Sequence, residues 1–355
     1  MTLPLETNDP FARLRGALSA DDHARIDVMA KVQAHYHVMK RDKRIEQAFT
    51  HLFEDTLVRY DPTRAAGEDN RIELRGLAIL GNSGAGKSRA LRYFFAGHVA
   101  FPGYGDLRSD CQAISVEVRA PTTHLGLGHR IMAATGFPVR GKVTAHQVWE
   151  MVYERLLLKR IFVIHLNELH NFFLTCKDAD RKDLLNSIKS FMTNPTWPVI
   201  VVVSGLPMLK EVLEGHDEDR RRFSFIPFRP LRVPASNPVL KQIAEKLADI
   251  AGLTLPPDFE EDIVPRLAWA ADHEWGTCIK IMHNAVRFAL NVNEKTGTAH
   301  TVLERDRFAE AWGFMTGSGR EANPFVIRNW KDVGCKLVMR DDTKPDPEPT
   351  GKKRK

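Results

Sequence analysis

Short apolar runs alternate with stretches of helical spacing through the middle of the chain. The apolar runs, each five to seven residues long, are 74–80, 113–118, 161–166 and 199–203. The stretches with apolar residues at helical intervals are 86–97, 125–135, 145–159, 181–192 and 207–214. Strands that are apolar on both faces are typical of a parallel sheet buried between helix layers. The pattern therefore predicts an open α/β fold in which right-handed crossovers join the strands.

The pattern changes at a linker marked by Pro227, Pro230, Pro234 and Pro238. Beyond it only helical spacing recurs, at 238–251, 260–271, 278–295 and 303–315. Before the first strand, residues 1–20 are typical of a loose arm and residues 21–58 have helical spacing. We expect four parts, which are an N-terminal arm with helices (1–70), an α/β domain (71–232), a small helical lid domain (233–320) and a C-terminal extension (321–355). The charged, proline-rich end of that extension, 341–355, is predicted to be disordered.

Composition narrows the class of protein without identifying it. The 355 residues are 43% hydrophobic and 27% charged, which is ordinary for a globular protein. The four cysteines form no CxxC pair and the fourteen histidines show no ligand spacing, so we predict neither a zinc site nor a disulfide framework. No apolar run approaches the roughly 20 residues of a membrane span and no signal-peptide pattern begins the chain, so a cytoplasmic protein is expected. The net charge of +6 permits a nucleic-acid partner but does not establish one.

The clearest chemical signal is Gly-Asn-Ser-Gly-Ala-Gly-Lys-Ser at 81–88, directly after an apolar strand. It matches GxxxxGK followed by Ser or Thr, the loop whose backbone N–H groups wrap a nucleotide's phosphates. A glycine-rich turn can match by chance, but the strand before the loop and the helix after it are the context that the motif requires. Lys87 can reach the β- and γ-phosphates, and the Ser88 hydroxyl can bind Mg²⁺. We predict ATP and Mg²⁺ as cofactors, with nucleotide contacts from Asn82, Ser83, Gly84, Ala85, Gly86, Lys87, Ser88 and Arg89.

Polar residues follow the next two buried strands. Asn167 and Glu168 come directly after 161–166, where nucleotide hydrolases usually have an Asp-Glu pair. Asparagine can hydrogen-bond a water bound to the metal but carries no negative charge, whereas Glu168 can act as the general base. We therefore predict an ATPase that Asn167 makes slow, unless the pair is only a turn with an incidental acid. Ser204 follows 199–203 and either senses the γ-phosphate or belongs to a plain strand-to-helix turn.

A run of three arginines, within Asp-Arg-Arg-Arg-Phe at 219–223, follows the last helix of the α/β region. Such charge runs are usually solvated surface. The alternative is that Arg221 or Arg222 is an arginine finger that reaches the γ-phosphate bound by a neighbouring subunit. In that case the active site lies between subunits and the protein works as a homo-oligomer.

This order of motifs resembles the AAA+ class of P-loop ATPases and, within it, the TniB/TnsC transposition regulators related to the phage Mu B protein. The local cues are Pro121-Thr122-Thr123, Thr135-Gly136-Phe137-Pro138, Asn167-Glu168-Leu169-His170-Asn171 and Ser204-Gly205-Leu206-Pro207. The resemblance implies an AAA+ parallel sheet with a helical lid. It also implies ATP-dependent assembly of a ring or helical filament on double-stranded target DNA. Such an assembly would recruit a transposase and possibly a TniQ-like target-selection protein.

The resemblance further implies which segments face the DNA and the nucleotide. Polar residues after the second strand and between the next two helices would suit phosphate contacts with little base reading. They are Arg119, Thr122, Thr123, His124, Arg130, Arg140, Lys142 and Thr144. Lys280, in the predicted lid, is a candidate nucleotide sensor. The alternatives are solvated loops without a DNA role, an AAA+ loader or remodeller acting on a protein partner, and a nucleotide-gated scaffold with little hydrolysis.

Overall fold

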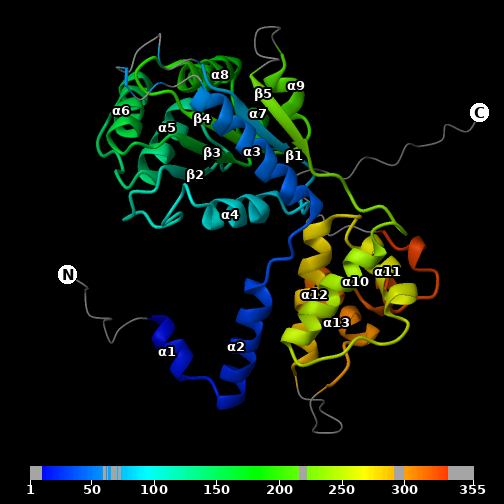
Figure 1. Cartoon of the computed structure of the whole chain (residues 1–355). Helices are drawn as coiled ribbons and strands as arrows, with labels where there is room; N and C mark the ends of the chain where they lie inside the picture. Colours follow the sequence, from blue (N-terminus) through cyan, green and yellow to red (C-terminus); the bar gives the residue numbers. More distant parts are fainter. Residues whose placement is uncertain are drawn as a thin grey trace, which may run out of the picture. The chain divides into compact units, whose positions relative to one another are not determined.

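The computed structural model describes residues 10–58, 61, 63–64, 70, 73–215, 222–291 and 300–334 of the chain. These residues form two compact units (Figure 1). The α/β unit consists of the described residues within 36–230 together with Glu274–Gly276. The helical unit consists of the described residues within 10–35, 231–273 and 277–334. The short segment Glu274–Gly276 therefore belongs to the α/β unit, although its neighbours in the chain belong to the helical one.

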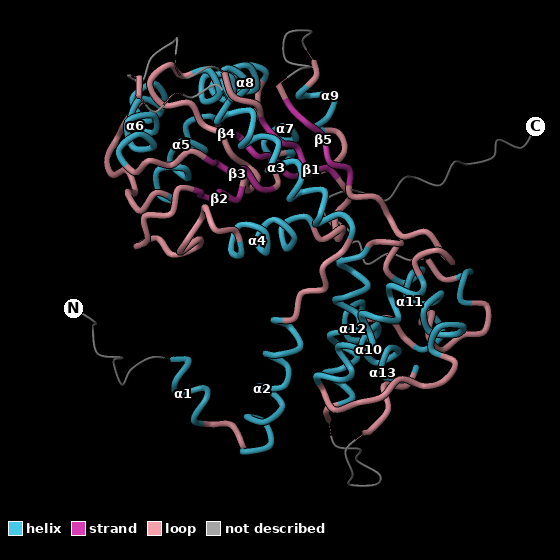
Figure 2. The backbone as a smooth tube through the Cα atoms, viewed as in Figure 1, coloured by secondary structure: helices cyan, strands magenta, loops and turns pink. Residues whose placement is uncertain are grey.

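Among the described residues, five parallel strands form the sheet of the α/β unit (Figure 2). In the spatial order β2-β3-β4-β1-β5, they are β2 (Ala113–Glu117), β3 (Val163–Asn167), β4 (Ile200–Gly205), β1 (Gly76–Leu80) and β5 (Phe223–Pro227). Four of them lie on the predicted apolar runs, so the predicted parallel sheet is confirmed. The sequence pattern does not predict β5, because this strand ends at the first proline of the expected linker. Pro227 is tolerated there because β5 is an edge strand, where proline's missing N–H breaks no ladder bond.

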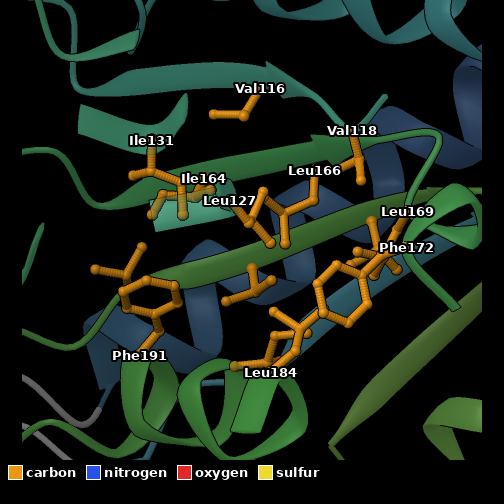
Figure 3. Packing of buried hydrophobic residues seen from close by; sticks show 14 of the residues in the cluster. Val116, Val118, Leu127, Ile131, Ile164, Leu166, Leu169, Phe172, Leu184 and Phe191 are labelled. Atoms are coloured by element: carbon orange, nitrogen blue, oxygen red, sulfur yellow. The ribbon is translucent and has the colours of Figure 1, made fainter. Parts of the chain in front are cut away.

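Helices cover both faces of this sheet. They are α3 (Lys40–Val58), α4 (Lys87–Gly97), α5 (His124–Ala134), α6 (Ala145–Leu158), α7 (His170–Thr175), α8 (Asp178–Thr193) and α9 (Leu209–Leu213). Apolar residues of α3 and α4 form a buried cluster with one face, and those of α5 to α9 form a second cluster with the other face. Figure 3 shows part of the second cluster. Along β3, Val163 belongs to the first cluster, whereas Ile164 and Leu166 belong to the second. The sheet is therefore buried on both sides, as is typical of parallel sheets.

The helical unit is built from α1 (Pro10–Gly16), α2 (Ala20–Ala34), α10 (Asn237–Ile250), α11 (Val264–Ala270), α12 (Trp275–Ala289) and α13 (Arg305–Thr316). A π-helical turn (Phe259–Ile263) precedes α11, and two 3₁₀ turns (Arg320–Ala322 and Trp330–Asp332) follow α13. Phe308, Trp312 and Phe325 are at most 2% exposed in its core. The predicted tail 341–355 lies outside the described residues, and within those residues no helix is both long and apolar enough to cross a membrane.

The N-terminal region differs from the prediction in two ways. Residues 10–16 form α1, where the sequence pattern predicts a loose arm. The predicted helical stretch 21–58 is two helices, with a break at residues 35–39. Asp42 caps the second helix by accepting a hydrogen bond from the Met39 backbone N–H over 2.6 Å. As a result, α2 belongs to the helical unit and α3 to the α/β unit.

Candidate nucleotide site

The predicted phosphate-binding loop connects β1 to α4. Gly84 and Gly86 have φ angles of 78° and 89°, a left-handed conformation that favours glycine. Lys87 begins α4, is 4% exposed, and donates to the carbonyl oxygens of Gly81 and Asn82 over 2.9 Å each. The ammonium group therefore lies inside the curve of the loop, where this motif binds phosphate.

Three of the predicted polar residues meet beside this loop. The Asn167 Oδ1 atom accepts hydrogen bonds from the hydroxyls of Ser88 and Ser204, each over 2.8 Å. This is possible because β4 lies between β3 and β1, so the carboxyl ends of the three strands adjoin. The structure thus brings together the residues predicted to bind Mg²⁺ and to sense the γ-phosphate.

A buried histidine extends this cluster, although the sequence interpretation did not include it. His165 Nε2 lies 2.9 Å from the Ser204 hydroxyl, and His165 Nδ1 lies 2.8 Å from the Ser115 hydroxyl. Burial lowers the pKa of His165 to about 3, so the ring is neutral. The signal in the sequence is a single polar residue inside the apolar run 161–166.

Glu168 follows β3 with a φ of 57°, which is uncommon for a residue other than glycine. Its Oε2 atom lies 3.3 Å from His170 Nδ1, and its side chain is 31% exposed. Burial lowers the pKa of His170, and the negative charge of Glu168 partly offsets this effect. The Glu168 charge also acts on Lys87, whose pKa is lowered mainly by burial. A partly exposed carboxylate near the phosphate-binding lysine is suited to polarise an attacking water.

Residues distant in the sequence hold the loop from outside its motif. The Arg41 guanidinium donates to the Ala85 carbonyl oxygen over 2.6 Å and lies 4.7 Å from the centre of the Phe228 ring. The Asn82 amide donates to Glu274 over 2.8 Å. Nothing in the local sequence signals these contacts, because they depend on how α3 and the segment 274–276 fold against the loop.

Gly276 also approaches the phosphate-binding loop. A Cβ atom at this position would lie 2.6 Å from the Gly84 carbonyl oxygen and 3.1 Å from the Gly86 backbone nitrogen. No larger residue fits without a shift of the loop backbone, so a glycine is required there. Ser83 and Arg89, both predicted to contact nucleotide, have exposed side chains.

The two candidates for the arginine finger, Arg221 and Arg222, have different outcomes. Arg221 lies outside the described residues. Arg222 forms an ion pair with Glu73 of the same chain, and its side chain is 13% exposed. Its backbone carbonyl also accepts from the Gly76 N–H over 2.7 Å, at the start of β1. Arg222 therefore has a structural partner within its own subunit.

The nucleotide sensor predicted at Lys280 belongs to the other unit. It lies on α12, with an exposed side chain, in the part of that helix assigned to the helical unit. Its role as a sensor stays a prediction.

Several predicted DNA contacts have partners within the chain. Thr123 and Thr144 cap α5 and α6, where their hydroxyls accept from backbone N–H groups. Thr122 is only 8% exposed. The His124 ring stacks on Trp149 at 4.5 Å and lies 2.8 Å from the Ser187 hydroxyl. These contacts give each of the four residues a structural role, whether or not DNA binds nearby.

The basic candidates are more accessible. Arg119, Arg140 and Lys142 have exposed side chains, and Arg130 is half-buried on α5. Arg119 pairs with Glu117 over 3.2 Å, but both side chains are more than half exposed, so this pair constrains the arginine weakly. Of the eight predicted DNA contacts, Arg119, Arg140 and Lys142 are best placed to meet a phosphate backbone.

The residues around the loop fit a Mg²⁺ ion bound together with nucleotide phosphates. Ser88 and Glu168 offer a hydroxyl and a carboxylate oxygen, the donor class that Mg²⁺ prefers, whereas the amide oxygen of the predicted ligand Asn167 already accepts from Ser88 and Ser204. Across the described ranges, no group of three or more His, Cys, Asp or Glu is arranged to hold a metal by itself. A bound Mg²⁺ would therefore take most of its ligands from phosphates and water.

Comparisons with known proteins agree with this geometry. Residues 64–232 match the model of the family described as Bacterial TniB protein. The ORC1 protein of Aeropyrum pernix, solved in complex with DNA, has a TM-score of 0.53 and 17% identity over 81% of this chain and 68% of that one. The ORC2 protein of the same organism, solved with ADPNP and ADP, has a TM-score of 0.53 and 13% identity over 78% and 69%. No curated protein matched the sequence.

The Cdc6p protein of Pyrobaculum aerophilum is a further structural neighbour, with a TM-score of 0.50 and 16% identity over 79% of this chain and 69% of that one. At such identities these likenesses establish the fold alone, which is that of the P-loop AAA+ ATPases. The family match places the loop, the strand end at Asn167 and the Ser204 turn inside one recognised domain. Residues 64–232 of this chain are thus similar to the Bacterial TniB protein family, and the chain has the fold of the P-loop AAA+ ATPases.

Proposed function

We propose that this protein is an ATP-dependent regulator of DNA transposition, which assembles as an oligomer on double-stranded target DNA and recruits a transposase. The observation that carries the proposal is the TniB-family match over residues 64–232. The convergence of Ser88, Asn167 and Ser204 beside the phosphate-binding loop supports nucleotide binding in that domain. A TniQ-like protein is a further partner that this family relationship suggests.

The residues around the proposed nucleotide site have different roles. Lys87 and the loop N–H groups bind the phosphates, and Ser88 supplies a metal ligand. Mg²⁺, when bound, neutralises phosphate charge. Glu168 is the general base for the attacking water, and the nearby His170 restricts its position. Lys280 on α12 is the proposed nucleotide sensor.

DNA would contact the edge of the α/β unit where α5 and α6 begin. The two helix starts adjoin, because the Trp149 indole of α6 donates to the His124 carbonyl oxygen of α5 over 3.2 Å. Helix N-termini carry partial positive charge and suit phosphate. However, Asp180 accepts from the His124 backbone N–H over 3.1 Å and brings negative charge to this edge. The exposed basic residues on either side therefore have to supply most of the attraction.

One observation favours a second candidate, a nucleotide-gated scaffold with little hydrolysis. Asn167 replaces a negative charge by an amide whose oxygen already accepts from Ser88 and Ser204. Such a site can bind nucleotide tightly while it stabilises the transition state poorly. Transposition regulation needs ATP-dependent assembly and is compatible with slow turnover, so a low rate of hydrolysis does not separate the two candidates, whereas DNA binding does.

The test is electron microscopy of the full chain with duplex DNA and ATP, a non-hydrolysable analogue, ADP or no nucleotide. Rings or filaments on DNA that need ATP or its analogue are expected. Failure to bind DNA in every nucleotide state would refute the transposition role and leave the loader and scaffold alternatives.

Salt dependence of DNA binding tests the proposed surface. Replacing Arg119, Arg140 or Lys142 by Ala should in each case make the negative slope of log affinity against log salt shallower by about 1. Lys246→Ala, on α10 of the helical unit, is the matched control and should leave the slope unchanged. If all four variants behave like the wild-type chain, DNA binds elsewhere.

A further inference from the structure

A row of hydrogen-bonded side chains crosses three adjacent strands next to the phosphate-binding loop. It runs from Ser115 on β2 through His165 on β3 to Ser204 on β4, and then back to Asn167 at the end of β3. His165 and Ser204 are 2% and 0% exposed. Ser115 and His165 are register partners, so their side chains share one face of the sheet. His165 and Ser204 lie within an otherwise apolar layer, which includes Phe95 at 5.9 Å from the His165 ring, whereas Ser115 on the edge strand β2 is exposed.

Hydrogen counting gives this row a direction. A hydroxyl has one hydrogen to donate, and that of Ser204 goes to Asn167 Oδ1. Ser204 must therefore accept from His165 Nε2, which lies 2.9 Å away and so carries the ring hydrogen. The other ring nitrogen, Nδ1, is then an acceptor and takes the Ser115 hydroxyl hydrogen over 2.8 Å. The neutral ring is thus fixed as the Nε2–H tautomer.

This counting starts from the orientation of the Asn167 amide. Its oxygen accepts from the hydroxyls of both Ser88 and Ser204, which uses its two lone pairs. No described residue accepts a hydrogen bond from its amide nitrogen. The hydrogen bond from Ser88, the second residue of α4, places the Asn167 side chain beside the loop that binds phosphate in this motif.

We propose that His165 is a positioning residue, which acts through Ser204 to hold the Asn167 amide with its oxygen toward the two serines and its N–H₂ group available to a phosphate oxygen. The proposal rests on the proposed nucleotide binding. It assigns Asn167 the role of a phosphate donor, whereas an aspartate at this position would accept from a water bound to Mg²⁺. Nucleotide binding should then depend only weakly on Mg²⁺.

The reverse orientation of the amide makes a different prediction. If the Asn167 nitrogen donated to Ser204, the Ser204 hydroxyl would donate to His165 Nε2 and the ring hydrogen would be on Nδ1. The Asn167 oxygen would then face the metal. The tautomer of His165 therefore reports which way the amide points.

Nitrogen NMR of the full chain labelled with ¹⁵N-histidine measures this tautomer directly. The His165 signals are identified as those that disappear in His165→Gln. We expect the hydrogen on Nε2 both without nucleotide and with ADP. A hydrogen on Nδ1 in either state would overturn the proposal, and this measurement does not depend on activity.

The Mg²⁺ dependence of binding provides the second readout, as the ratio of the Kd of a fluorescent ATP analogue in EDTA to its Kd in Mg²⁺. His165→Asn reaches only the Nδ1 position, so it releases Ser204 and should raise the ratio by about fivefold, the effect of one hydrogen bond. Ser204→Ala breaks the same relay with a smaller change of volume and should raise the ratio similarly. His165→Gln places an amide N–H near the Nε2 position and should keep the wild-type ratio.

The control is His98→Gln, at the opposite end of α4, which should leave the ratio unchanged. A wild-type ratio in both His165→Asn and Ser204→Ala would overturn the proposal, provided that the wild-type chain binds the analogue. If the wild-type chain binds no nucleotide, the proposed function fails instead, while the tautomer in the nucleotide-free protein still decides how the amide is oriented.

Discussion

Compared with the aspartate that is usual at this position, Asn167 lacks the negative charge but still has a hydrogen-bond acceptor. Its Oδ1 atom contacts Ser88 and Ser204 just as one oxygen of a carboxylate would. What is missing is the second carboxylate oxygen and its charge, which would act on a metal-bound water. Electrostatic preorganisation is often the largest contribution to enzymatic rate. We therefore expect the missing carboxylate oxygen to lower the rate of ATP hydrolysis more than the affinity for nucleotide.

Asn167→Asp should therefore raise the rate of ATP hydrolysis by about tenfold, with a smaller change in nucleotide affinity. Steady-state phosphate release and analogue binding measure the two quantities. Asn194→Asp is the matched control, because Asn194 Oδ1 accepts from the Thr196 and Trp197 N–H groups at a turn, which an aspartate can also do. An unchanged rate in Asn167→Asp would mean that residue 167 does not act on the metal.

At the scale of elements, apolar runs and glycine motifs were sufficient to predict four strands and the phosphate-binding loop. Burial on both faces leaves a clear signal in each strand, and parallel strand ends adjoin, so Ser88, Asn167 and Ser204 could be expected to meet. The pattern of apolar runs does not predict the edge strand β5, because an edge strand needs fewer apolar residues and tolerates Pro227. The break before α3 depends on one cap by Asp42, and the contact of Arg41 with the loop depends on tertiary packing.

Arg41 shows how an element outside the motif contributes to the site. It is the second residue of α3, its side chain is half-buried, and burial lowers the pKa of its guanidinium. Arg41→Met removes the hydrogen bond to the Ala85 carbonyl oxygen and the cation–π contact with Phe228, but its thioether can still pack against that ring. Because that charge-assisted bond orders the loop, we expect nucleotide affinity to fall by about three- to tenfold.

Isothermal titration with ADP measures this loss. Arg44→Met, at an exposed position on the same helix, removes an equal charge and should bind like the wild-type chain. Equal losses in both variants would point to the overall charge of α3 rather than to the bond with Ala85.

For the whole molecule, the main question is whether one subunit completes the active site of another. Arg222 is engaged with Glu73 in its own chain and adjoins the start of β1, so its removal should destabilise the α/β unit, by about 1 kcal/mol, rather than a subunit interface. Thermal unfolding measures this effect, and Arg222→Lys should restore part of the stability. Arg221 then becomes the sole candidate for a finger acting across subunits among the two arginines predicted for this role.

Mixing two inactive variants tests that role in the assembled protein. Lys87→Ala lacks a working loop and Arg221→Ala lacks the finger, so neither variant alone should hydrolyse ATP on DNA. When the two variants are mixed in equal amounts, one half of the subunits in a ring or filament have an intact loop. One half of those loops face a subunit with an intact Arg221, so about one quarter of the wild-type activity per subunit should return. Recovery requires that the two residues act across an interface, because a site within one chain would stay inactive in every mixture. Arg222→Ala, which should retain its own activity, serves as the control for mixing and stability.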